Sequence, residues 1–199
     1  MLHEAAQPVL PYVGGALHLS IAAGIGLGTL ARWLGTERVV RAMPNTPALV
    51  GQGMTGLYTP AATPDADREL AESALRSTGQ LLWVDDEALI DSVTAVSGSG
   101  PAYVFFFIEA LEQAGVEMGL TAEQAHQLAV GTFTGASALA AASNDTPAVL
   151  RQRVTSKGGT TFAAISSMEA DRVKDSIVRA LHAARLRAQE LEQEFGRAD

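Results

Sequence analysis

Along residues 1–85, short apolar runs typical of strands are followed in turn by longer amphipathic runs typical of helices. Short apolar or β-branched runs bounded by turn residues are typical of buried strands. We expect such strands at residues 17–23, 38–43, 55–59 and 80–84. Longer runs with a helical period predict helices at residues 2–13, 28–34 and 64–77. This alternation predicts an α/β domain built on a parallel sheet.

Beyond Asp86 the pattern is helical throughout, and we expect no further strand. Thr121-Ala122-Glu123-Gln124 is a capping-box sequence that opens one helix, and Thr146-Pro147 opens another. The predicted helices lie at residues 87–96, 101–118, 121–142, from 147, 160–168 and 172–195. We therefore predict two domains, an α/β part over residues 1–86 and an all-helical part over residues 87–199.

Charge and composition exclude several functional classes. The formal charge is −8 and the 14 basic residues are scattered, which argues against nucleic acid as a partner. The chain has no cysteine, so disulfides and thiolate metal sites are excluded, and its four histidines lack metal-ligand spacing. We expect no metal, no membrane span and no signal peptide, and hence a cytoplasmic protein.

Two local patterns resemble functional motifs but are better explained as structural features. Gly24-Ile25-Gly26-Leu27-Gly28 lies between a strand and a helix, yet a dinucleotide-binding loop needs glycine at position 29, where the chain has threonine. We therefore interpret this segment as a strand-to-helix turn. The acidic run Asp85-Asp86-Glu87 is typical of a helix N-terminal cap.

Residues 97–103 (SGSGPAY) and 154–161 (VTSKGGTT) each combine glycines and hydroxyls just before a helix. We expect such segments to gather free backbone N–H groups that can hold a small anion. In the second segment, the N–H groups of Gly159, Thr160 and Thr161 are the candidate donors to a carboxylate. The spacing alone is equally compatible with an ordinary glycine-rich turn capped by threonine.

Four segments together carry a resemblance to a known family. They are Arg41–Pro47 (RAMPNTP), Trp83–Glu87 (WVDDE), Val93–Tyr103 (VTAVSGSGPAY) and Pro147–Glu169 with its central Gly-Gly-Thr-Thr. In this order and spacing the chain resembles the pyrroline-5-carboxylate reductases, which catalyse the last step of proline synthesis. The resemblance spans nearly the whole chain.

The resemblance implies the reduction of the C=N bond of 1-pyrroline-5-carboxylate to L-proline by hydride transfer from NADPH or NADH. It implies an α/β remnant of a Rossmann-type domain followed by an all-α helical dimerisation domain. That helical domain would interleave with a partner chain, giving a homo-oligomer that is at least a dimer. The three consecutive rings at residues 105–107 favour this, because they cannot all face one core.

The resemblance also implies which residues form the site. The substrate carboxylate would be bound by Ser156, Gly159, Thr160 and Thr161, and the Thr161 hydroxyl would act in catalysis by hydrogen-bonding the ring nitrogen. Glu87 matches an acidic position near the active site. The segments that would line the nicotinamide side of the cleft are Ala22-Ala23-Gly24 and Met43-Pro44-Asn45.

The chain departs from the family pattern at its beginning. Members of the family start with a strand and a G-x-G-x-x-G loop, and we find neither in this sequence. The chain therefore matches the family without the N-terminal part of its dinucleotide-binding domain, and its preference between NADPH and NADH cannot be predicted. The alternative hypothesis is a non-catalytic fragment that dimerises or binds a ligand.

Overall fold

The computed structural model describes residues 4 and 6–196. It divides into two compact units, the first made of residues 1–101 and 180–199 and the second of residues 102–179. Helix α9 (Val173–Gly196) begins in the second unit and ends in the first. The predicted domain boundary between residues 86 and 87 rests on the sequence pattern and stays a prediction.

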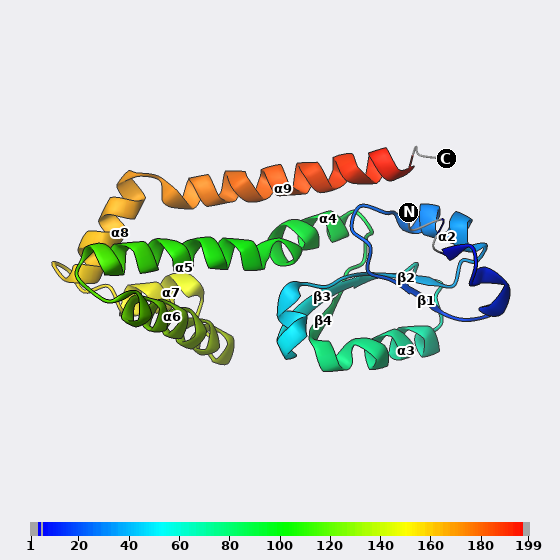
Figure 1. Cartoon of the computed structure of the whole chain (residues 1–199), viewed down its shortest axis with the longest axis horizontal. Coiled ribbons are helices and arrows are strands. Elements are labelled where there is room, and N and C mark those ends of the chain that lie inside the picture. The colour runs from blue at the N-terminus through cyan, green and yellow to red at the C-terminus, as the bar shows by residue number, and fades with distance from the viewer. Residues whose placement is uncertain (1–3, 5, 197–199) are drawn as a thin grey trace. The chain divides into compact units, whose positions relative to one another are not determined.

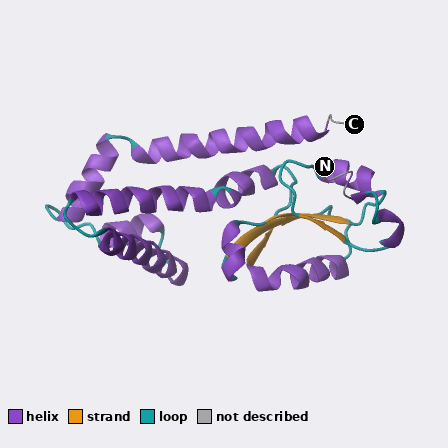
Figure 2. Ribbon diagram, viewed as in Figure 1, coloured by secondary structure: helices purple, strands orange, loops and turns teal. Residues whose placement is uncertain are grey.

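The first unit is a four-stranded sheet with helices on both faces (Figures 1 and 2). Its elements are β1 (His18–Ser20), α2 (Leu27–Leu34), β2 (Val39–Met43), a 3₁₀ helix (Thr46–Val50), β3 (Gly53–Tyr58), α3 (Asp65–Leu75), β4 (Gly79–Trp83) and α4 (Leu89–Val93). Further 3₁₀ turns lie at Leu10–Tyr12 and Arg76–Thr78. The four predicted strands are thus present. Of the helix predicted over residues 2–13, residues 2, 3 and 5 lie outside the described part.

The strand order is β1-β2-β3-β4, but the sheet is mixed and not parallel as predicted. The pairs β1–β2 and β3–β4 are parallel, whereas β2 and β3 are antiparallel with Ala42 opposite Leu57. The physical reason is the connection between β2 and β3, which spans only residues 44–52. A parallel crossover needs a dozen or more residues, so this short connection reverses the chain.

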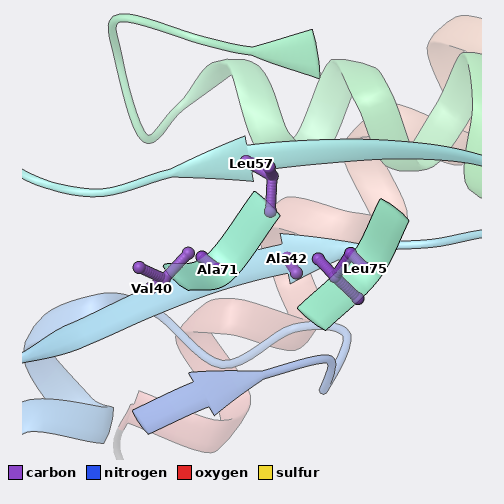
Figure 3. Packing of buried hydrophobic residues seen from close by; sticks show 5 residues of the cluster. All are labelled: Val40, Ala42, Leu57, Ala71 and Leu75. Carbon is purple, nitrogen blue, oxygen red and sulfur yellow. The ribbon is translucent and has the colours of Figure 1, made fainter. Parts of the chain in front are cut away.

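Alternate residues of the central strands pack on opposite faces of the sheet. On one face, Val40, Ala42 and Leu57 form a core with Ala71 and Leu75 of α3 (Figure 3). On the other face, Val39 packs against Ile25, Leu27 and Leu30 at the start of α2. Burial of each large aliphatic side chain contributes about 1.5–3 kcal/mol, so these two clusters hold the sheet to its helices.

The helix predicted over residues 87–96 is broken into two kinds of helix. It begins as α4 at Leu89 and continues from Thr94 to Gly98 as a π-helix. The backbone N–H of Ser99 donates to the Thr94 carbonyl oxygen at 2.8 Å. The expectation that residues 97–103 gather free N–H groups is therefore wrong at Ser99, because the π-helix uses that donor.

The second unit is helical. It contains most of α5 (Gly100–Glu117), followed by α6 (Ala122–Ala142), α7 (Pro147–Arg153), α8 (Thr160–Ala170) and the first part of α9. The predicted capping box is confirmed, since Thr121 and Gln124 exchange hydrogen bonds of 2.9 and 3.2 Å. The Thr146 side chain caps α7, also as predicted. Within the described residues, no helix is long and apolar enough to cross a membrane.

Candidate functional site

Both segments predicted to line a cofactor follow parallel strands. Residues 22–24 come just after β1, and residues 43–45 begin at the last residue of β2. Ser20 pairs with Arg41 in the parallel register, so the two segments lie at the same edge of the sheet. Ligands of α/β sheets bind outside the carboxyl ends of parallel strands. The topology therefore brings these two predicted segments together at an edge suited to a ligand.

The first segment is held from two sides. The Ala22 N–H donates to the Ser20 hydroxyl at 3.3 Å. Gly24 has φ +72°, and a Cβ there would lie 3.0 Å from the Leu191 Cβ and 3.2 Å from the Phe195 ring. Glycine is thus required for the conformation and for the approach of the last turns of α9. Ala23 lies exposed between these two anchored residues.

In the second segment, Met43 and Asn45 turn their side chains to the π-helix. A Cβ on Gly98 would lie 2.6 Å from the Met43 methyl. The Asn45 amide donates to the Ser97 carbonyl and hydroxyl oxygens at 3.2 and 3.3 Å and accepts from the Met54 N–H at 2.9 Å. Asn45 therefore fixes the turn that includes Pro44, and its contact with a cofactor stays a prediction.

Glu87 occupies the start of α2. Its Oε1 accepts hydrogen bonds from the Leu27 N–H at 2.6 Å and from Arg41 Nη1 at 2.8 Å. Glu87 thus caps α2 and not the helix that follows it in sequence, where Asp86 accepts from the Ala88 N–H at 2.9 Å. Its predicted contact with substrate stays a prediction.

Arg41 is a residue whose importance the sequence reasoning missed. It is only 2% exposed, and its Nη1 also reaches Glu192 Oε2 at 3.3 Å. Its Nε has no hydrogen-bond partner among the described residues. A charged residue inside the β-branched strand VVRAM was the available signal, because a buried guanidinium requires a carboxylate partner.

Asp91 lies beside this ion pair and is 5% exposed. Burial raises its pKa above the usual aspartate value, and the charges of Glu192 and Glu87 act in the same direction, whereas Arg41 and Arg185 oppose the shift. The three carboxylates of this group, Glu87, Asp91 and Glu192, border an open pocket of about 520 Å³. Its lining is Glu87, Ala88, Asp91, Gln189, Glu192 and Gln193. No cluster suited to a metal ion occurs in the part of the chain that the structure describes.

The residues predicted to bind substrate meet at the start of α8. Gly158 has φ +77°, and Gly159 is the N-cap in an extended conformation. The Gly159 N–H donates to the Ser156 carbonyl at 3.0 Å, so it is not free as predicted. The N–H groups of Thr160 and Thr161 have no backbone acceptor among the described residues. This first turn of α8 therefore carries two open donors at its positive end.

The Ser156 hydroxyl lies directly over Gly159. A Cβ at position 159 would approach the Ser156 Oγ to 2.7 Å, so any side chain there displaces this hydroxyl. Thr161 is half-buried, while Thr160 and Ser156 are exposed. The neighbouring pocket of about 540 Å³ between α7 and α8 is lined by Thr155, Lys157 and Phe162, among others, and by none of these four predicted residues.

The comparison with known proteins agrees with this arrangement. The family described as pyrroline-5-carboxylate reductase dimerisation matches residues 87–191. The chain is 50% identical over 181 residues to a pyrroline-5-carboxylate reductase of Pseudomonas aeruginosa, covering 90% of this chain and 66% of that protein. The chain belongs to the pyrroline-5-carboxylate reductase family.

Solved structures of pyrroline-5-carboxylate reductases share the fold. The reductase of Coxiella burnetii superposes with a TM-score of 0.88 at 38% identity, covering 96% of this chain and 72% of that chain. The Plasmodium falciparum reductase, with NADP bound, also has a TM-score of 0.88, at 31% identity and with coverage of 96% and 75%. The α/β remnant of a Rossmann-type domain followed by an all-helical region is thereby confirmed.

The chain spans about two thirds of the length of the curated reductases it matches, 66% of the Pseudomonas protein and 64% of the one from Pisum sativum. The pea reductase is 41% identical over 175 residues, which cover 88% of this chain. The family resemblance predicted from the four sequence segments is confirmed by these matches.

Proposed function

We propose that this chain reduces 1-pyrroline-5-carboxylate to L-proline with NADPH or NADH. The proposal rests chiefly on its 50% identity to a pyrroline-5-carboxylate reductase over 90% of the chain. In this reaction a hydride adds to the imine carbon and a proton to the imine nitrogen, which leaves the C=N bond reduced. The reductases of Haemophilus influenzae and Pisum sativum, which are 40% and 41% identical to this chain, point to the same reaction and do not favour a non-catalytic fragment.

The start of α8 supplies the groups that the substrate needs. The open N–H groups of Thr160 and Thr161 lie at the positive end of a helix, which favours a carboxylate. The Ser156 hydroxyl above Gly159 adds a further donor. In our proposal the Thr161 hydroxyl hydrogen-bonds the ring nitrogen and orients the imine, since orientation and charge placement account for most of the protein's contribution.

In the first unit, the ends of β1 and β2 fit the nicotinamide of the cofactor, whereas the start of α2 does not fit its phosphate groups. The carboxyl ends of β1 and β2 offer residues 22–24 and 43–45 for the nicotinamide side. The start of α2 does not fit a phosphate group, because the Glu87 carboxylate already takes the Leu27 N–H. A bound nicotinamide would supply the hydride. The residues that would hold the nicotinamide are Ala22, Ala23, Gly24, Met43, Pro44 and Asn45.

We further propose that the helical region forms a homodimer and that the protein is cytoplasmic. The match of the dimerisation family over residues 87–191 supports the dimer. Phe105 and Phe106 are 57% and 68% exposed, which is unusual for phenylalanine in a monomer. We place the division between the dinucleotide-binding and dimerisation domains near residue 86.

The decisive experiment is a steady-state assay of the 199-residue chain with pyrroline-5-carboxylate and either NADPH or NADH. Thr161→Val should lower kcat on the order of a hundredfold, the usual contribution of a positioned proton donor. Thr134→Val, on the exposed face of α6, is the matched control and should leave kcat unchanged. Absence of turnover by the unsubstituted chain with both cofactors would refute the proposed function, and an unchanged kcat in Thr161→Val would refute the role of its hydroxyl.

A further inference from the structure

One carboxylate oxygen in the first unit joins two segments that are distant in sequence. Glu87 Oε1 accepts from the Leu27 N–H at 2.6 Å and from Arg41 Nη1 at 2.8 Å. Both distances are short, as expected when the acceptor is charged. Leu27 is the first residue of α2, and Arg41 lies in the middle of β2. Glu87 therefore ties the start of a helix to an adjacent strand.

Both bonds matter because their donors have few other partners. The Arg41 side chain is 2% exposed, and its second carboxylate, Glu192, lies at the longer distance of 3.3 Å. A buried guanidinium without a close carboxylate is strongly destabilising. The Leu27 N–H belongs to the first turn of α2, which has no side-chain cap from its own N-cap residue, Gly26. Glu87 supplies the acceptor from outside the helix.

The two donors stand next to the two segments assigned to the cofactor. Leu27 follows Gly24 by three positions, and Arg41 precedes Met43 by two positions in the same strand. A displacement of either donor is passed along the backbone to its segment. We propose that Glu87 is a positioning residue, which sets the spacing of residues 22–24 and 43–45 through Leu27 and Arg41. This inference rests on the proposed function.

A positioning role and direct contact with substrate make opposite predictions for the two Michaelis constants. If Glu87 positions the cofactor segments, Glu87→Ala raises the KM for NADPH about tenfold, the weight of one charge-assisted hydrogen bond. The KM for pyrroline-5-carboxylate then stays unchanged. Glu87→Gln, which keeps an oxygen acceptor and loses the charge, should give an intermediate KM for NADPH and also serves if the alanine variant does not fold.

Glu192→Gln is the matched control. Glu192 accepts from Arg41, but among the described residues no N–H at the start of α2 donates to it, so its variant should leave the KM for NADPH unchanged. A rise confined to the KM for pyrroline-5-carboxylate in the Glu87 variants would overturn the inference in favour of substrate contact. Unchanged values for both constants would overturn it as well.

Amide hydrogen exchange separates this inference from the proposed function. An unsubstituted chain without turnover refutes the function, and exchange on the same proteins then decides the positioning role. We expect faster exchange over residues 22–28 and 41–45 together in Glu87→Gln and in neither segment in Glu192→Gln. Unchanged exchange in either segment of Glu87→Gln would overturn the inference.

Discussion

Two buried threonines of the first unit, Thr55 within β3 and Thr59 just after it, should respond in opposite directions to the same substitution. Thr55 is fully buried, and its hydroxyl has no hydrogen-bond partner among the described residues. Thr59 is 3% exposed, and its hydroxyl donates to the Val39 carbonyl at 3.0 Å and lies 2.8 Å from the Thr63 hydroxyl. Replacement by valine removes the hydroxyl in each case while keeping the branched shape.

The expected magnitudes follow from these partners. A buried hydroxyl without a partner costs about 1–3 kcal/mol, so Thr55→Val should stabilise the protein by about 1 kcal/mol. Thr59→Val leaves a buried carbonyl without its donor and should destabilise by about 1–2 kcal/mol. For a chain of this size, each kcal/mol corresponds to roughly 2–4 °C in Tm. The two variants should therefore differ clearly in thermal stability.

Urea unfolding followed by tryptophan fluorescence measures this difference. The chain has two tryptophans, Trp33 in α2 and Trp83 in β4, so both report on the unit that contains the threonines. The free energy of unfolding should rise in Thr55→Val and fall in Thr59→Val, at an unchanged denaturant dependence. A loss of stability in Thr55→Val equal to that in Thr59→Val would refute the reasoning, because it would mean that the Thr55 hydroxyl is satisfied.

Two aspartates give further predictions of opposite sign. The Arg38 guanidinium lowers the pKa of Asp67 from its usual 3.8 through a side-chain hydrogen bond, so Asp67 stabilises the fold above that pH. Asp67→Asn should lower Tm at neutral pH, and the difference should vanish as the pH falls through the lowered pKa. Burial raises the pKa of Asp91 from 3.8, so its charge opposes folding as the pH rises through the raised value. Asp91→Asn should therefore raise Tm at neutral pH and have no effect in acid, and equal Tm differences at both pH values would contradict either assignment.

Much of the secondary structure could be predicted because the hydrophobic period changes clearly from strand to helix. The capping residues Thr121 and Thr146 mark helix starts that the structure confirms. The direction of β3 could not be derived from strand pattern, since it depends on the length of residues 44–52. The π-helix at Thr94–Gly98 was also missed, because its Ser and Gly residues are typical of turns.

The sequence predicted which segments form the candidate site, but it did not predict which side chains within them contact one another. The four sequence motifs identify the family, and the sheet brings residues 22–24 and 43–45 to one edge. The sequence does not show which distant residue each side chain contacts. Asn45 is engaged with Ser97 and Met54, and Glu87 with Arg41 and Leu27, through partners up to 60 positions apart. Such long-range pairs have no local signature.

Because the chain reverses between β2 and β3, β1 and β2 run in one direction and β3 and β4 in the other. A new strand laid parallel to β1 on its outer side would carry its own following loop to the edge where residues 22–24 and 43–45 lie. A strand laid parallel to β4 would deliver its following loop to the opposite edge, because β3 and β4 run the other way. Among additions of parallel strands, which the two outer pairs of this sheet already use, the β1 flank is therefore the one from which new loops, in evolution or in design, can bring ligand groups to this edge.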